Sequence, residues 1–218
     1  ENKRYYAYKS FTEKMLTGES SGIPGDGYAE DIDSITAEEM MMHYKIVLER
    51  APLAVIFAGD LGGVPVKRYV KLLNLPQNNR VASDVQEPHR FSGEKNYSES
   101  EDLSQNRLCL GFSSSAERNG INMAAGKVFS EILGGAGSSR LYKSVREKEG
   151  LAYYVSSSFS PFTMCVSVET GIGSDKDKCV EIIKREIENI KKKGFSRKEI
   201  SQAKKEILKG LSALSDSK

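Results

Sequence analysis

The sequence predicts an α+β protein in which helices cover an antiparallel sheet as a two-layer domain. Apolar residues alternate with polar or small ones over 107–112, and again over 152–159 and 164–170, as expected for half-buried strands. Two segments after residue 174 repeat apolar residues at helical spacing, so each presents one apolar face. Strands and one-sided helices in the same part of the chain favour helices packed on a sheet.

The first part of the chain begins with two predicted helices. Residues 4–17 have an amphipathic pattern, and a loop rich in Gly and Ser follows. Thr36 with Glu39 forms a capping-box signature, which opens a helix from residue 37 to about residue 50.

A buried strand and a short helix complete this first part. Residues 53–58 form a continuous apolar run of strand length, which Gly59 ends. A short helix is predicted over 64–73. From residue 75 to residue 102 the apolar periodicity fades, and prolines and acidic residues interrupt the segment. The sequence therefore predicts a first domain over 1–74, a linker over 75–102 and a second domain over 103–218.

The second domain begins with a strand over 107–112 and a helix over about 120–133. A hairpin around residues 160–162 joins the two later strands. Asp175 opens the next helix and Gly194 closes it.

The last helix starts at a second capping box, formed by Ser196 with Glu199. Its apolar stripe runs to Leu214, four residues before the chain stops. The chain opens directly on a helical pattern and stops soon after this stripe, so we expect it to be a fragment.

Composition excludes several classes of protein. The net charge of +2, with basic and acidic residues interleaved, argues against a nucleic-acid partner. No run approaches the roughly 20 apolar residues that span a bilayer, so no membrane segment is expected. The first residues do not resemble a signal peptide. Three cysteines without metal spacing favour reduced, buried thiols, and we expect a cytoplasmic protein.

The most informative stretch runs from Gly134 to Tyr154. Its small-residue run, 134–139, could cradle a phosphate, but it lacks the Lys of a P-loop. A tight turn with Ser138 or Ser139 as N-cap is the favoured interpretation. Further on, Arg146 lies near a helix end and Tyr153 follows seven residues later. Spacing alone leaves two roles open for this pair. Arg146 could cap carbonyl groups at its helix end while Tyr153 packs in the sheet, or both side chains could point to one shared site.

This stretch resembles the C-terminal domain of the pitrilysin/insulinase metallopeptidases, which include the mitochondrial processing peptidase. The matching residues are Ser138, Ser139, Arg140, Leu141, Val145, Arg146, Glu147, Lys148, Leu151, Ala152 and Tyr153. The resemblance implies that residues 1–74 are the C-terminal remnant of a first, zinc-type domain similar to the second. It also implies that the second domain, 103–218, is truncated at its end.

The zinc motif of these enzymes, H-x-x-E-H, is missing from this sequence. The two histidines, His43 and His89, are 46 positions apart. Glu13 and Glu19 are the earliest carboxylates, and neither lies in a matching motif. Zinc is therefore implied for the parent family, while no metal ligand is assigned here and no zinc is expected on this chain.

The resemblance gives Arg146 and Tyr153 a role in substrate binding and transition-state stabilisation. In the family the matching pair polarises the carbonyl of the scissile peptide bond, which is oxyanion-type stabilisation. The partner implied is a peptide or unfolded polypeptide, held as an added strand at a sheet edge.

Two functions follow from the resemblance. The leading hypothesis is a fragment of a zinc-dependent metalloendopeptidase-like protein that hydrolyses peptides, in which this part positions the substrate and is inactive alone. The alternative is a noncatalytic partner subunit, in a homodimer or in a heterodimer with an active pitrilysin-like subunit. A purely structural dimerisation module is the least favoured.

Overall fold

The computed structural model describes residues 2–51, 54–73, 94–100, 105–113, 120–135, 137–160, 163–171 and 175–216. The chain divides into two compact units, of which the first combines residues 1–23 with residues 88–218. The second unit comprises residues 24–87. Most of the predicted linker over 75–102 lies outside the described residues, and the described part, 94–100, is neither helix nor strand. The predicted domain boundaries stay a prediction.

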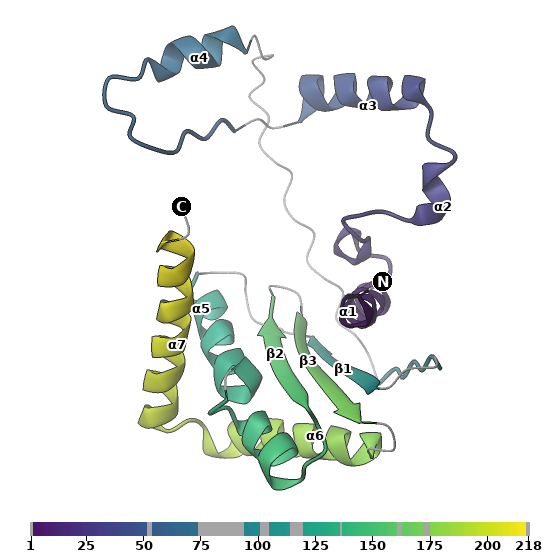
Figure 1. Cartoon of the computed structure of the whole chain (residues 1–218), viewed down its shortest axis with the longest axis vertical. Coiled ribbons are helices and arrows are strands. Elements are labelled where there is room, and N and C mark those ends of the chain that lie inside the picture. The colour runs from purple at the N-terminus through teal and green to yellow at the C-terminus, as the bar shows by residue number, and fades with distance from the viewer. Residues whose placement is uncertain are drawn as a thin grey trace. The chain divides into compact units, whose positions relative to one another are not determined.

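A three-stranded antiparallel sheet forms the centre of the first unit (Figure 1). Its strands are β1 (Gln105–Ser113), β2 (Tyr154–Phe159) and β3 (Thr163–Gly171), in the order β1-β3-β2. The three strands predicted after residue 103 and the hairpin pairing of β2 with β3 are confirmed.

Helical segments cover one face of this sheet. They are α5 (Gly120–Ser130), η2 (Glu131–Gly135), η3 (Tyr142–Lys148) and α6 (Lys176–Lys193). The last helix, α7 (Arg197–Asp216), packs against α5 and η2. The α5 and η2 segments correspond to the one helix predicted over 120–133, and η2 and η3 have π-helical turns. The α+β class and the layer of helices on the sheet are confirmed.

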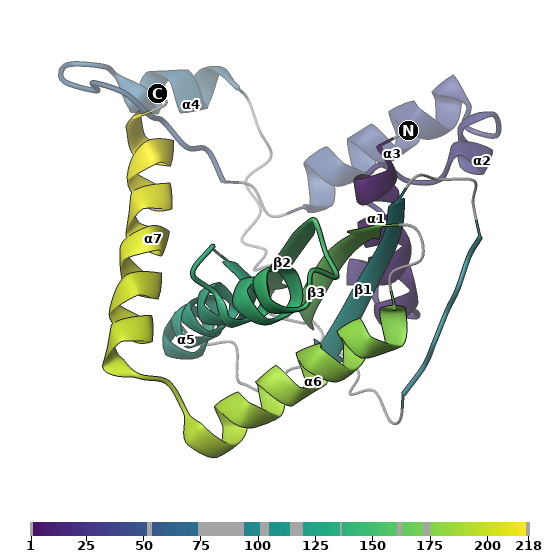
Figure 2. The ribbon, with the colours of Figure 1, turned by 60° about the horizontal axis from the view of Figure 1, so that its bottom comes forward.

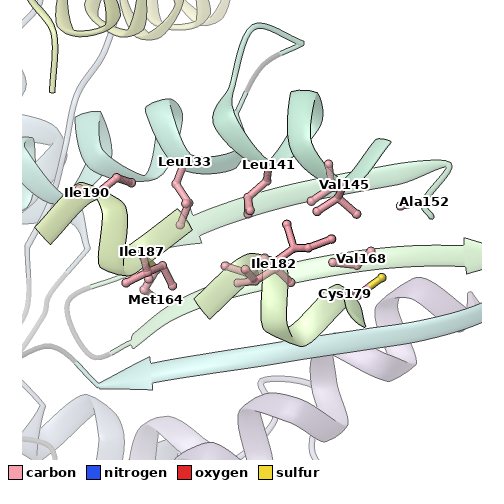
Figure 3. Packing of buried hydrophobic residues seen from close by; sticks show 13 residues of the cluster. Leu133, Leu141, Val145, Ala152, Met164, Val168, Cys179, Ile182, Ile187 and Ile190 are labelled. Atoms are coloured by element: carbon pink, nitrogen blue, oxygen red, sulfur yellow. The ribbon is translucent and has the colours of Figure 1, made fainter. Parts of the chain in front are cut away.

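The core lies between these helices and the sheet (Figure 3). Burial of a Val, Leu, Ile or Met side chain contributes about 1.5–3 kcal/mol, before the entropy lost on folding is subtracted. The buried cluster contains Leu133, Leu141, Val145, Ala152, Val155, Met164, Val166, Val168, Cys179, Ile182, Ile183, Ile187 and Ile190.

Helix α6 contributes five of these side chains because its apolar residues repeat at helical spacing. Its ends are the predicted ones. The Asp175 carboxylate accepts a hydrogen bond of 2.9 Å from the Lys178 amide, and Gly194 ends the helix with φ 68°. A residue with a Cβ atom rarely adopts that left-handed conformation.

Small residues bring α5 and η2 close to β2. A Cβ atom at Gly126 would collide with the Phe159 ring, and one at Gly134 would lie 2.9 Å from the backbone nitrogen of Ser157. Between these two contacts, the Ser157 hydroxyl donates a 2.8 Å hydrogen bond to the carbonyl oxygen of Ser130. The segment that leads into the Gly-rich turn is therefore placed directly on the sheet.

Helix α1 (Lys3–Met15) lies beside β1 in the first unit (Figure 2). The Asn2 side chain caps it by accepting from the Arg4 and Tyr5 amides. A short turn, η1 (Ser20–Gly22), follows. Although residues 1–74 were predicted to form one domain, α1 packs in the same compact unit as the sheet.

The second unit contains α2 (Ala29–Ile32), α3 (Ala37–Arg50) and α4 (Val66–Leu72), and none of these helices has a buried residue. The predicted capping box of Thr36 and Glu39 is confirmed.

The prediction of a buried strand over 53–58 is wrong for the described part, 54–58. This part is not a strand, and Ile56 is 87% exposed. A strand requires a neighbour for its backbone hydrogen bonds, and none of the described residues pairs with this segment.

None of the helices in the described residues combines the length and the apolar character needed to cross a membrane.

We predict that Gly134→Ala destabilises the first unit by about 1–3 kcal/mol, because the new methyl group meets backbone atoms of β2 that cannot move aside. Urea unfolding monitored by circular dichroism measures this. Gly210→Ala is the matched control, since a Cβ atom there meets nothing within 4 Å and alanine favours the α7 helix. Equal stability of the two variants would contradict the close packing at Gly134.

Candidate functional site

The Gly-rich turn places its last serine at the start of the next helix. Ser139 is 3% exposed, and its hydroxyl accepts a hydrogen bond of 3.4 Å from the Tyr142 amide. This is the N-cap role predicted for Ser138 or Ser139, and it belongs to Ser139. The turn therefore supplies a helix start.

Arg140 joins this helix start to the connection between α6 and α7. Its guanidinium donates to both carboxylate oxygens of Glu199, at 2.7 and 3.2 Å, and to the carbonyl oxygen of Gly194 at 3.0 Å. The same group lies 5.8 Å from the centre of the Phe195 ring. A guanidinium that binds both oxygens of one carboxylate fixes direction as well as distance.

Glu199 has a second set of partners in the predicted capping box. Its carboxylate accepts from the Ser196 amide and hydroxyl, each at 2.8 Å, and its own amide donates to the Ser196 hydroxyl at 3.2 Å. The hydrogen bond from Arg140 is the main cause that lowers the pKa of Glu199 to about 2, and the Ser196 bonds add to it. The charged form is therefore strongly favoured.

A small cavity of about 150 Å³ lies beside the same turn. Among its lining residues, Glu131 has a raised pKa, caused first by burial and then by the charge of Glu206. Neither Arg146 nor Tyr153 lines this cavity.

Arg146 lies on the π-helical segment η3, on its solvent-exposed side. Its guanidinium is 4.9 Å from the centre of the Tyr142 ring, a cation–π arrangement one turn earlier on the same segment. Val145, the preceding residue, is fully buried and fixes the orientation of the segment. Arg146 is thus held by an aromatic ring at the surface.

A tight turn separates Arg146 from Tyr153. Gly150 has φ 64°, and its amide donates to the carbonyl oxygen of Arg146 at 3.2 Å. The Leu151 amide donates to the carbonyl oxygen of Val145 at 3.0 Å. These bonds satisfy carbonyl groups at the helix end through the backbone, without the Arg146 side chain.

Tyr153 immediately precedes β2 and is 65% exposed. Its neighbour Ala152 is buried, and so is Val155 two positions on. Packing of Tyr153 in the sheet core, one of the two roles left open by its spacing, is therefore wrong. Both Arg146 and Tyr153 present their side chains to solvent, while their joint role in binding stays a prediction.

The described residues do not fit a zinc site. They contain no group of three His, Cys, Asp or Glu side chains that could hold a metal ion. His43 is exposed on α3, and His89 lies outside the described residues. The three cysteines are not in disulfides, and Cys165 and Cys179 are buried. We therefore assign no chemical step to a metal on this chain.

The family described as "Peptidase M16 inactive domain" matches residues 34–207. The chain belongs to this family. The resemblance carried by the stretch from Gly134 to Tyr154 is thereby confirmed.

Curated relatives of this M16 chain have names of two kinds. The "probable inactive metalloprotease YmfF" of Bacillus subtilis is 27% identical over 213 residues, which cover 94% of this chain and 48% of that protein. The "non-peptidase homolog YmxG" of Helicobacter pylori is 30% identical over 190 residues, which cover 84% of this chain and 43% of that protein. An "uncharacterized zinc protease YmxG" of Bacillus subtilis is 27% identical over 198 residues, which cover 86% of this chain and 46% of that protein. The chain thus spans about half the length of these relatives.

A solved structure has a similar fold. The crystal structure of a conserved protein from Enterococcus faecalis V583 is 25% identical, with a TM-score of 0.78. The similarity covers 100% of this chain and 52% of that one.

We predict that Glu199→Gln lowers the free energy of unfolding at pH 7 by roughly 1–2 kcal/mol, since the paired side chains of Arg140 and Glu199 are only 21% and 31% exposed. The folded-state pKa lies below the unfolded one, so the stabilisation exists above pH 4.5 and is lost as the pH falls toward 2. In urea unfolding between pH 7 and pH 3, the free energies of unfolding of the wild-type chain and the Glu199→Gln variant should converge as the pH falls.

The matched control for this variant is Glu188→Gln, which removes an exposed carboxylate paired with Lys191 on α6. A Glu188 variant with the same loss as the Glu199 variant would contradict the special role of the Arg140 pair.

We also predict that the chain binds no stoichiometric zinc, because its sequence lacks two histidines at metal spacing. Elemental analysis after dialysis against micromolar zinc measures this. One zinc per chain, lost in a His43→Ala variant, would overturn the prediction.

Proposed function

We propose that this chain is a noncatalytic M16 subunit that binds unfolded polypeptide and works beside a partner that carries the zinc motif. One observation carries the proposal. A chain that matches the M16 inactive domain over residues 34–207 lacks the H-x-x-E-H motif throughout its 218 residues. The general base and both histidine ligands would then have to come from another polypeptide or another part of a longer protein.

The names of two relatives support the noncatalytic role. The proteins named probable inactive metalloprotease and non-peptidase homolog align with 94% and 84% of this chain. Because the chain spans about half of each, the activity of the whole protein belongs to the proposal as well. The partner would be a second copy of the chain or, in the favoured case, an active pitrilysin-like subunit.

The exposed pair supplies the chemistry for binding polypeptide. The Arg146 guanidinium and the Tyr153 hydroxyl are hydrogen-bond donors, and a peptide carbonyl oxygen is the acceptor that an extended chain offers everywhere. Stacking on Tyr142 restricts the Arg146 side chain before a ligand arrives, which reduces the entropy lost on binding. Hydrogen bonds to backbone carbonyl oxygens do not depend on the side chains of the bound polypeptide, so such a site would bind many sequences.

A second function is favoured by a different relative. The Bacillus subtilis protein named uncharacterized zinc protease aligns with 86% of this chain. In that case the chain would be the substrate-positioning part of an active zinc peptidase, with the zinc site elsewhere in a longer protein. Arg146 and Tyr153 would then stabilise the developing oxyanion, and losing one donor would cost about a hundredfold or more in rate.

Binding is tested with fluorescein-labelled, reduced and carboxymethylated α-lactalbumin as the unfolded probe, measured by fluorescence anisotropy. We expect saturable binding and no hydrolysis by the 218-residue chain. Arg146→Ala and Tyr153→Phe should each weaken binding about tenfold, as expected for the loss of one hydrogen bond to a backbone carbonyl.

The control variants are Arg185→Ala, an exposed arginine on α6, and Tyr69→Phe, a half-exposed tyrosine on α4. Equal effects in control and site variants would show nonspecific binding and contradict the proposal. Hydrolysis of the probe by a longer protein that contains this chain, blocked by the chelator 1,10-phenanthroline, would support the peptidase instead.

A further inference from the structure

The two faces of the sheet have different side chains. In the register of β1 and β3, Leu110 lies opposite Val166, and Val166 is part of the core under the helices. The next pair, Gly111 opposite Cys165, therefore points to the other face, because side chains alternate along a strand. Cys109 shares this second face with Cys165, two positions away along the paired strands.

Helix α1 covers this second face. A Cβ atom at Gly111 would meet the Phe11 ring at 2.6 Å and the Met15 sulfur at 2.7 Å, so α1 stands directly over the glycine. The Cys109 thiol lies 3.9 Å from the carbonyl oxygen of Ala7, also on α1. A glycine and cysteines leave room for the helix to approach closely.

The burial of Cys165 follows from this arrangement. Cys165 is 2% exposed although it lies outside the core cluster. Ser158, its opposite neighbour on β2, is exposed. The Phe11 ring and the Met15 sulfur stand over Gly111, the register partner of Cys165, so α1 is the described element that covers Cys165. Helix α1 also reaches β2, where the Arg4 guanidinium lies 4.4 Å from the centre of the Tyr154 ring.

Residue 7 and residues 9–15 of α1 are half-buried. No residue between Lys3 and Met15 is fully buried. The Glu99 carboxylate accepts from the Tyr6 hydroxyl at 2.7 Å and from the Ser10 hydroxyl at 3.5 Å, and Lys14 lies 3.8 Å from it. The Lys14 ammonium also stands 5.1 Å from the centre of the Tyr97 ring. Residues 94–100 thus form a strap that contacts α1 through Tyr97 and Glu99. At its other end, Glu94 accepts a hydrogen bond of 2.9 Å from Lys184 on α6.

We infer that α1 is a lid over the second face of the sheet, held by the strap and able to open while the core stays folded. Elements with few buried apolar contacts open at a lower free energy than the domain as a whole. The core under α5, η3 and α6 contains thirteen buried residues, whereas α1 contributes none. Opening would uncover Cys109, Gly111 and Cys165 together and leave Cys179 buried.

The three cysteines report this opening directly. Trypsin places Cys109, Cys165 and Cys179 on separate peptides, so mass spectrometry can follow iodoacetamide labelling of each in the native 218-residue chain. We expect Cys165 to be labelled at least tenfold faster than Cys179, because Cys179 requires opening of the core.

The strap is tested with Glu99→Gln, which weakens the contacts to Tyr6, Ser10 and Lys14. We expect labelling of Cys165 to accelerate about fivefold, with Cys179 unchanged. Glu188→Gln, which removes an exposed carboxylate on α6, is the matched control and should change neither rate. A thermal melt of each variant shows that the core remains folded.

Two results would overturn the inference. Equal labelling rates of Cys165 and Cys179 in the wild-type chain would mean that the second face opens only with the core. A Glu99 variant that accelerates both cysteines alike would mean that the strap stabilises the whole unit and not the lid.

Discussion

Burial of the α6 apolar stripe against the sheet is the constraint on which the rest of the first unit depends. Cys179, Ile182, Ile183, Ile187 and Ile190 fill the space between the helices and β3, and Val166 and Val168 meet them from the sheet. Because interiors pack to nearly crystalline density, this contact fixes which face of each strand points inward. It therefore also decides which side chains of β1 and β3 remain for the second face.

The residues of the M16-like motif divide into two groups by environment. Leu141 and Val145 are fully buried, Ser139 caps the helix, and Arg140 is engaged by Glu199 and the Gly194 carbonyl. These residues place the segment. Arg146 and Tyr153, next to this framework, face solvent on either side of the Gly150 turn. These two exposed donors are the groups to which we assign the proposed binding of polypeptide.

The second face of the sheet shows how a small residue can direct the placement of a distant segment. Gly111 has no side chain, so the Phe11 ring and the Met15 sulfur of α1 occupy the space above the strand. Polar contacts from Glu99 then complete the attachment. Helix α1 is held along its length by half-buried side chains and polar contacts, whereas the core elements are held by fully buried side chains.

Local signals in the sequence determined most of the elements. The Asp175 cap, the Gly194 stop and the boxes at Thr36 and Ser196 each act within four residues, so their hydrogen bonds could be predicted without a fold. Alternation and helical spacing likewise predicted β1, β3 and the stripe of α6, because the side-chain period of each element is fixed by its backbone.

Long-range partners were decided only by the tertiary structure. A local sequence pattern cannot predict which distant residues form a pair. Arg140 pairs with Glu199, 59 positions away, and Glu99 pairs with Tyr6, 93 positions away. The apolar run at 53–58 predicted a buried strand, yet its described part is exposed because burial depends on a neighbour that local sequence does not supply. For the candidate site, sequence resemblance singled out Arg146 and Tyr153. Their exposure followed only from the packing of Val145, Ala152 and Val155 beneath them.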